Sequence, residues 1–330
     1  MAGRALAFAD PAIVKLAREE FIPVAADDWY QRRRQDDEGK FFRAVADQGP
    51  RKGEGGSTRQ GIYIFTAAGK LLVYRNHQDP DVMRSVVNQG LKAFKQLPAE
   101  ERKPGALKVA APAKVDAAYH RAPPKDGVIV NVFTRILDKK EGELCAGTCA
   151  FPGGDKAARD HLWLFADEWK TLVANDKIGD TRPLPERLAY RLARFHLVDN
   201  TRGEPPAWSR QDLRTHDLKM TLLRVDRGLR SYRLEGSLLL STSADAAKAE
   251  RGYDVRLLGY VDHDARRGAI TRFDIVAVGE HWGQGTFTRG ARPGRTPLGV
   301  AFSLARGDLP ADRVPPQFAR EWQRYVQAEK

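Results

Sequence analysis

The sequence predicts an α+β protein of two domains, an N-terminal α/β domain followed by an α+β domain with a mostly antiparallel sheet. Three observations lead to this prediction. Residues 21–94 follow the order strand, helix, strand, strand, helix in their apolar periodicity. Residues 98–126 are rich in Pro, Lys and Ala, as in an extended linker. Residues 127–330 contain paired β-like runs around turn residues, so we place the two domains at 1–97 and 127–330.

The N-terminal domain carries recognisable helix starts and short apolar runs. An aspartate before a helix can accept hydrogen bonds from its first free N–H groups, and proline is well tolerated in the first helical turn. The expected elements are helices opened by Asp10-Pro11, by Asp27-Asp28 (over 29–46) and by Asp79-Pro80, a buried strand at 21–26, and two hairpin strands at 61–66 and 70–74.

This order resembles the thioredoxin fold, in which a Trp-Cys-x-x-Cys motif opens the helix after the first central strand. The matching residues here are 29–33, which keep Trp29 and place Tyr30 and Arg33 at the two cysteine positions. That family also places a cis-proline before the hairpin, whereas residues 58–61 contain no proline. Thiol–disulfide exchange needs a reactive thiolate and a second, resolving thiol. The resemblance therefore implies a thioredoxin-like domain without the redox dithiol.

The second domain is predicted from strand runs, two hairpin signals and amphipathic segments, and it resembles no family that we identify. The expected elements are strands at 128–137, 218–225, 231–241, 253–261, 269–278 and 297–304, and helices at 157–173, 185–197 and 315–327. Such an order, with helices segregated from strands, favours a mostly antiparallel sheet.

Composition limits the classes of function. The 330 residues carry a formal net charge of +12. The basic residues are spread over both parts of the chain, so we expect a generally basic surface and no dedicated nucleic-acid site. Apolar runs are too short to span a membrane, and no secretory signal is visible, which predicts a soluble, cytoplasmic protein. Export remains the alternative if the true start lies upstream.

Cys145 and Cys149 are the only cysteines, and they lie four residues apart in a Gly- and Pro-rich stretch. Three interpretations stay open: two inert residues, a disulfide or redox pair that would make the protein a thiol-disulfide oxidoreductase, and a metal site. A structural zinc site needs four ligands, and His161 is the only nearby candidate for a third. We therefore predict no metal site and no cofactor, and we keep the two cysteines as candidate catalytic residues.

A second candidate site follows the strand expected at 269–278. His281 and Trp282 stand there among three glycines, in a segment that combines a titratable group, an aromatic ring and flexible backbone. Such a combination can form the mouth of a ligand pocket, although a plain strand-ending loop is the alternative.

A third candidate site is the helix start at the thioredoxin-like end. Asp28, Trp29, Tyr30, Arg32 and Arg33 are expected there, with Arg59 approaching from the opposite loop, unless these are simply a capped helix start with solvated arginines. Our leading hypothesis is a non-catalytic binding or scaffolding protein that recognises an unknown partner with this face. The alternatives are the cysteine redox protein and a β-rich domain that binds a small ligand near His281.

Overall fold

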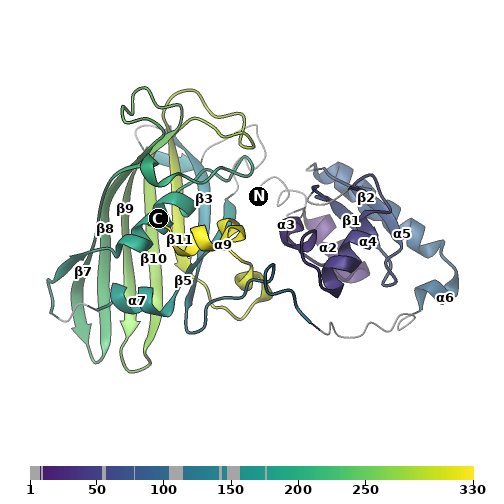
Figure 1. Cartoon of the computed structure of the whole chain (residues 1–330), viewed down its shortest axis with the longest axis horizontal. Coiled ribbons are helices and arrows are strands. Elements are labelled where there is room, and N and C mark those ends of the chain that lie inside the picture. The colour runs from purple at the N-terminus through teal and green to yellow at the C-terminus, as the bar shows by residue number, and fades with distance from the viewer. Residues whose placement is uncertain are drawn as a thin grey trace. The chain divides into compact units, whose positions relative to one another are not determined.

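The computed structural model describes Phe8 and residues 10–53, 57–77, 79–103, 114–140, 143–146, 157–174 and 177–330, with the backbone alone for 139–140 and 143–146. Its architecture is α+β, with a large antiparallel sheet, as the sequence predicts (Figure 1). Contacts divide the chain into two units between Arg121 and Ala122. Over the described ranges, no helix is both long and apolar enough to cross a membrane.

The N-terminal unit packs helices against a two-stranded antiparallel hairpin. Its elements are α2 (Pro11–Glu20), α3 (Asp28–Gln31), α4 (Asp37–Ala46), β1 (Ile62–Phe65), β2 (Leu71–Arg75), α5 (Pro80–Lys95) and α6 (Ala99–Arg102). The helix starts at Asp10 and Asp79 are confirmed, because the Asp10 carboxylate accepts from Ala12 N and Ile13 N and the Asp79 carboxylate accepts from Val82 N. The small core joins Ile13 of α2 and Ile64 of β1 to Met83 of α5.

Two predictions for this unit are wrong. Residues 21–26 are not in a strand, and Ile22 is 92% exposed, so the buried strand predicted from this apolar run does not form. The helix expected over 29–46 is two helices, because Asp36 caps a new one by accepting from Gly39 N at 3.1 Å. The ion pair between Asp36 and Arg34, with 2.6 Å from Nη2 to Oδ2, stabilises this interruption. The thioredoxin resemblance itself stays a prediction.

Part of the expected linker is folded against the N-terminal unit. Asp116 accepts from Gln35 N at 2.9 Å, and its own N–H donates to Asp36 at 2.9 Å. The ring of Tyr119 lies 5.7 Å from that of Trp29. Residues 116–121 therefore continue the first unit, which shortens any extended connection.

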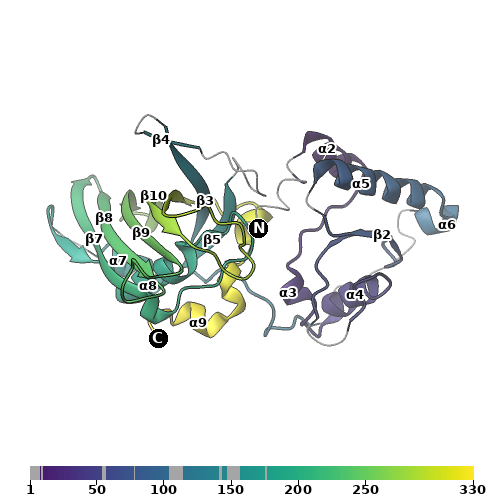
Figure 2. The same ribbon diagram turned by 90° about the horizontal axis from the view of Figure 1, so that it is seen from above.

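The C-terminal unit is built on a strongly curved antiparallel sheet (Figure 2). Its order is β4-β3-β11-β10-β9-β8-β7-β6, and β5 also pairs with β3. The strands are β3 (Val128–Lys140), β4 (Glu143–Ala146), β5 (Ala158–Leu164), β6 (Thr181–Pro183), β7 (Leu213–Asp226), β8 (Leu229–Ser241), β9 (Gly252–Asp264), β10 (Ala269–Trp282) and β11 (Thr296–Leu304). Both predicted hairpins are confirmed, β7–β8 and β9–β10.

The inner face of this sheet holds the main core. Along β9, for example, Val255 and Leu257 are buried whereas Arg256 and Leu258 are exposed, the alternation of a sheet covered on one side. The covering helices are α7 (Ala166–Leu172), α8 (Glu186–Arg191) and α9 (Trp322–Val326), which lie on the same face of the sheet in Figure 2. Leucines from α7 and α8 join the strand side chains in one cluster.

Three helix predictions in this unit need correction. The segment 157–173 is strand β5 followed by α7, because residues 158–164 pair with β3 and bury His161, Leu162 and Trp163 between neighbours. The helix predicted at 185–197 changes at Leu192 into a π-helical turn that ends at His196. The C-terminal helix predicted at 315–327 is a 3₁₀ turn followed by the short α9.

Candidate functional site

The predicted N-terminal face exists as a cluster, but its polar side chains are largely turned inward. The Asp28 carboxylate accepts from Arg59 N at 3.1 Å, so the loop before β1 does approach the start of α3 as predicted. It also binds Arg32 in an ion pair of 2.7 Å. The Arg59 side chain is only 3% exposed and binds Asp47 at 2.9 Å. The expectation that Arg59 lies on a binding surface is therefore wrong, since its charge is buried and paired.

The aromatic part of this face is more open. Arg33 stacks over the Trp29 ring at 4.4 Å, and Tyr119 packs beside that ring. Tyr30 is buried, with Arg121 5.9 Å above its ring. The half-buried side chains of Trp29, Arg33, Tyr119 and Arg121 form what we call the Trp29 cluster.

The cysteine site cannot be built from the described residues. Cys145 lies in β4, with its backbone opposite Asp138 of β3, and Cys149 lies outside the described residues. The redox and metal interpretations stay predictions. Among the described residues, no group of three or more His, Cys, Asp or Glu side chains is placed to hold a metal ion.

His281 lies in strand β10, one residue before its end, and not in the loop that the sequence suggested. It pairs with Tyr253 of β9 and with Thr296 of β11. Counting in steps of two from Phe273 and Ile275 places His281 on the covered inner face. The strand register thus carries the imidazole to one end of the core, where it is 7% exposed.

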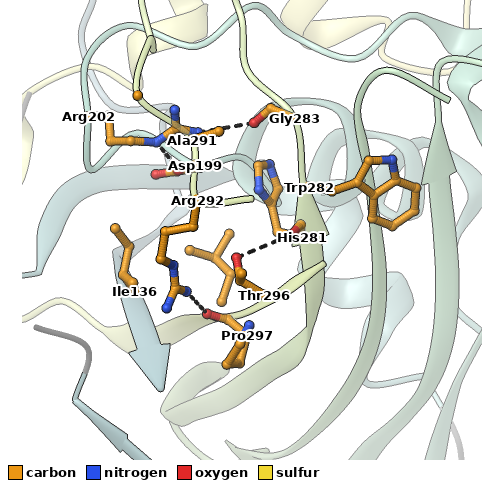
Figure 3. A pocket seen from close by; sticks show the side chains of 12 residues that line it. Ile136, Asp199, Arg202, His281, Trp282, Gly283, Ala291, Arg292, Thr296 and Pro297 are labelled. Carbon is orange, nitrogen blue, oxygen red and sulfur yellow. Dashed lines mark hydrogen bonds and ion pairs between the residues drawn. The ribbon is translucent and has the colours of Figure 1, made fainter. Parts of the chain in front are cut away.

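The segment after the π-helix brings Asp199 and Arg202 to the same end of the sheet. Asp199 accepts from the Thr201 hydroxyl at 2.6 Å and from Arg202 Nε at 2.8 Å. Arg202 also donates through Nη2 to the Gly283 carbonyl at 3.2 Å. Gly283 has a φ of +82°, and a Cβ there would meet the Glu250 carbonyl at 2.0 Å, so only glycine fits. Figure 3 shows this carboxylate–arginine pair beside the His281 ring.

Two hollows meet at these residues and share Asp199, Arg202, His281 and Gly283. Measured out to open solvent, they enclose about 340 and 210 Å³. The larger is completed by apolar and polar side chains, among them Ile136, Arg292, Thr296 and Leu298. The smaller is completed by Trp208, Arg251 and Thr288, with others. Because these volumes include open solvent, the enclosed space itself holds little more than a water molecule or one small group of a ligand.

Burial controls the charges in this site. Desolvation lowers the pKa of His281 to about 4, and the nearby Asp199 opposes this shift only in part. The imidazole is therefore neutral at pH 7. The pKa of Asp199 is lowered despite its burial, because the Arg202 guanidinium and the Thr201 hydroxyl favour its charged form; His281 adds to this only when it is protonated. The site thus holds a fixed carboxylate next to a neutral ring that can donate one hydrogen bond and accept another.

Trp282 contributes to the wall but its ring points away from the hollow (Figure 3). Its Nε1–H donates to the Ala249 carbonyl at 3.0 Å, and Arg295 stacks over it at 4.0 Å. The ring also covers the Gly252 backbone, where a Cβ would meet it at 2.0 Å. Trp282 therefore supports the end of β10, and its predicted role as a ligand contact stays a prediction.

Sequence reasoning missed Asp199, Arg202 and Arg251. Asp199 and Arg202 stand in a polar segment before Gly203, which the sequence marks only as the approach to a turn. Arg251 precedes β9 among other charged residues. Nothing in their local sequence pattern distinguishes them from solvated loop residues. Their position in the site is visible only in the folded structure, where their segments cover the inner face of the sheet.

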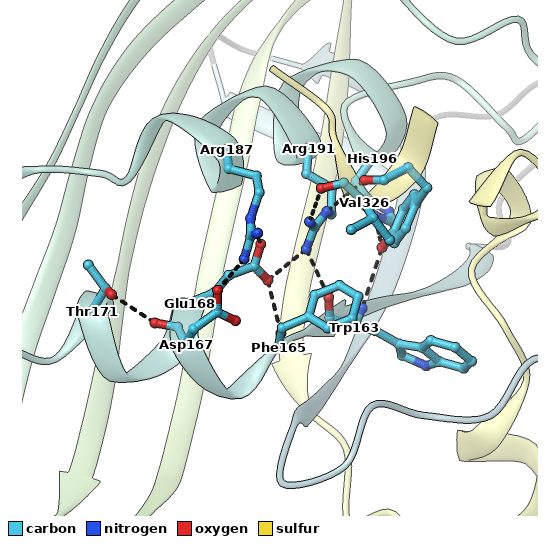
Figure 4. Close-up of polar contacts among 10 residues, drawn as sticks. Trp163, Phe165, Asp167, Glu168, Thr171, Arg187, Arg191, His196 and Val326 are labelled. Atoms are coloured by element: carbon cyan, nitrogen blue, oxygen red, sulfur yellow. Dashed lines mark hydrogen bonds and ion pairs between the residues drawn. The ribbon is translucent and has the colours of Figure 1, made fainter. Parts of the chain in front are cut away.

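A second buried polar cluster, which we call the C-terminal clamp, ties the end of the chain to α7 and α8 (Figure 4). Arg191 binds Glu168 at 2.6 Å, and the two side chains are 0% and 2% exposed. The same guanidinium donates to the Tyr325 carbonyl at 3.0 Å and the Val326 carbonyl at 3.1 Å. His196 bonds the Tyr325 hydroxyl at 3.0 Å and lies 3.6 Å from Asp160. This Asp–His–Tyr arrangement is sealed, so we assign it to structure.

No protein-family model, curated protein or solved structure matches this chain.

Proposed function

We propose that the C-terminal unit is a small-molecule-binding module whose ligand occupies the hollows around His281. The observation that carries this proposal is that the His281 imidazole has no hydrogen-bond partner among the described residues. Within the described part of the chain, neither ring nitrogen of His281 makes a hydrogen bond to another residue, and neither nitrogen is completely covered. A donor and an acceptor that border the hollow and lack protein partners can bond a ligand without breaking any contact within the protein.

The neighbouring Asp199–Arg202 pair supports the same proposal. Its geometry is held by the Thr201 hydroxyl and by the Gly283 carbonyl, so the site is organised before any ligand arrives. Preorganised polar groups in a mostly covered hollow are the usual arrangement of a small-molecule site.

A fragment screen by thermal shift tests the proposal. The library spans carboxylates, phosphates, amines and neutral amides. We expect at least one fragment to raise the melting temperature of the wild-type chain but not that of His281→Ala, because ligand binding stabilises only the folded form that binds it.

The matched control is His216→Ala, an exposed histidine of β7 that lines neither hollow. This variant should keep the response of the wild type. Fragments that stabilise His281→Ala equally, or a screen in which no fragment acts through His281, would refute the proposal.

A second candidate function is recognition of a protein partner by the Trp29 cluster, in line with a thioredoxin-like domain that has lost its dithiol. The observation that favours it is composition: half-buried Trp, Tyr and Arg side chains stacked on one another are the residue types that dominate protein interfaces. The exposed fraction of such a cluster decreases when a partner covers it.

Quantitative affinity purification tests this second candidate. The chain and its Trp29→Ala/Arg33→Ala variant are compared, with Phe94→Ala as a control at an exposed aromatic of α5. A partner retained by the wild type and the control but lost by the double variant is the expected result. Equal recovery with all three chains rejects the cluster as the recognition surface.

A further inference from the structure

The smaller hollow contains a buried positive charge that no carboxylate balances. Arg251 lines this hollow together with Asp199, Arg202 and His281, and it is 9% exposed. Asp199 is already paired with Arg202 at 2.8 Å. Across the described residues, no carboxylate lies within ion-pair distance of Arg251. The lining therefore carries one uncompensated positive charge.

The other cations near His281 differ from Arg251 in this respect. Arg202 is paired with Asp199, and Arg292 is paired with Asp138 at 2.5 Å. Arg251 instead stacks over the Trp208 ring at 3.9 Å and donates to the Pro206 carbonyl at 3.0 Å and to the Ala207 carbonyl at 3.5 Å. These contacts orient the guanidinium but leave its charge unneutralised. Burial accordingly lowers the pKa of Arg251, and only the attraction of Asp212 opposes this.

A buried charge without a counter-ion is costly, and removing that cost is a large part of how charged ligands are held. A guanidinium presents parallel N–H donors that match the two oxygens of a carboxylate or phosphate. Stacking on an aromatic ring keeps that planar group in one orientation.

From the unpaired, stacked Arg251 beside His281, we propose that the ligand carries an oxyanion group, a carboxylate or a phosphate, which binds Arg251 in the smaller hollow. This inference rests on the proposed function of the same site. The inference adds that the ligand is negatively charged and that Arg251 binds the charged group. Asp199 lines both hollows and repels an anion, so we expect the anionic group at the guanidinium of Arg251, beside the Trp208 ring.

The test compares acetate, inorganic phosphate and chloride at equal ionic strength, with acetamide as the neutral probe. Melting temperatures of the full chain and of Arg251→Met are measured in each. General salt effects act equally on both chains, so the difference between the chains reports the site. We expect acetate or phosphate to raise the melting temperature of the wild type by several degrees more than that of Arg251→Met. The larger of the two responses identifies the group.

Two further variants keep the inference open to refutation. Arg251→Lys keeps the charge and should keep part of the anion response. Arg295→Met removes an exposed arginine that also stacks on a tryptophan, at 4.0 Å, and should respond as the wild type does. In chloride, Arg251→Met should melt within a few degrees of the wild type, because no ion pair is lost.

The results that overturn the inference are specific. An equal anion response in the wild type and Arg251→Met means that the anion effect does not involve this arginine. A second result is that Arg251→Met melts far below the wild type while neither the wild type nor Arg251→Lys responds to anions. That result means that Arg251 only holds the segment at Pro206 in place. If neutral fragments bind through His281 while anions ignore Arg251, the inference fails and the proposed function stands. If no probe acts through His281 either, both fail.

Discussion

Two buried clusters of the C-terminal unit use the same residue types in opposite ways. In the C-terminal clamp, Arg191 meets a buried carboxylate and two backbone carbonyls, and both side chains of its ion pair are almost completely covered. In the site around His281, Arg251 has no carboxylate within ion-pair distance, and the imidazole bonds no other residue within the described part of the chain. The charge of Arg191 is balanced by Glu168 without a ligand, whereas the charge of Arg251 is not balanced by any carboxylate within ion-pair distance in the described residues.

This difference shows how buried polar groups can be assigned. A buried ion pair such as Arg191–Glu168 stabilises a specific packing, here the C-terminal segment against α7 and α8. A buried guanidinium without a carboxylate partner, such as Arg251, costs stability. Such a cost is tolerated mainly where ligand binding requires it. The catalytic appearance of Asp160, His196 and Tyr325 is therefore less informative than the unpaired state of Arg251.

The largest expected effect is in the clamp. Arg191→Met leaves the buried Glu168 carboxylate without its main partner and should lower the free energy of unfolding by about 3–5 kcal/mol. Urea unfolding measures this loss. Arg187→Ala is the matched control, because Arg187 binds the same Glu168 at 2.9 Å but is 32% exposed. Its cost should be about 1 kcal/mol or less. Equal costs for the two variants would contradict the assignment of the clamp.

The next effect is a pH dependence that belongs to His281. Its pKa is about 4 in the folded chain and near 6.5 in the unfolded chain, so between these values the unfolded chain binds a proton that the folded chain does not. Stability is complete above pH 6.5 and falls as the pH drops towards 4, by about 3 kcal/mol in total. Urea unfolding at pH 7 and pH 4.5 should show a smaller loss for His281→Gln than for the wild type. An identical pH dependence would mean that His281 is not buried as described.

A smaller effect is expected at the backbone support of the site. Gly283→Ala places a Cβ on a residue with φ +82° and against the Glu250 carbonyl, so the turn must shift at a cost of about 1–3 kcal/mol. That shift moves the carbonyl that accepts from Arg202. Gly268→Ala, at φ +62° with open space around it, is the control for backbone strain alone. Ligand binding should weaken in Gly283→Ala and not in Gly268→Ala, and the reverse order would remove Gly283 from the site.

Local signals predicted much of the fold. Aspartate and proline at helix starts placed α2 and α5, and the turn residues between apolar runs placed both hairpins of the large sheet. These features depend on a few neighbouring residues, which is why they are readable. The strand β5 was missed because its apolar residues also fit a helical spacing, and only pairing with β3 decides between the two.

The candidate site divides in the same way. The amino-acid sequence by itself determined the antiparallel α+β character of the chain and pointed to His281, because strand alternation, turn residues and isolated titratable groups are local properties. Only the tertiary structure decided that His281 faces the covered side of the sheet, that Trp282 faces away, and that Asp199, Arg202 and Arg251 meet there. The physical reason is that burial and the presence of a counter-charge depend on segments far apart in the sequence, which the strand register and the covering segments bring together.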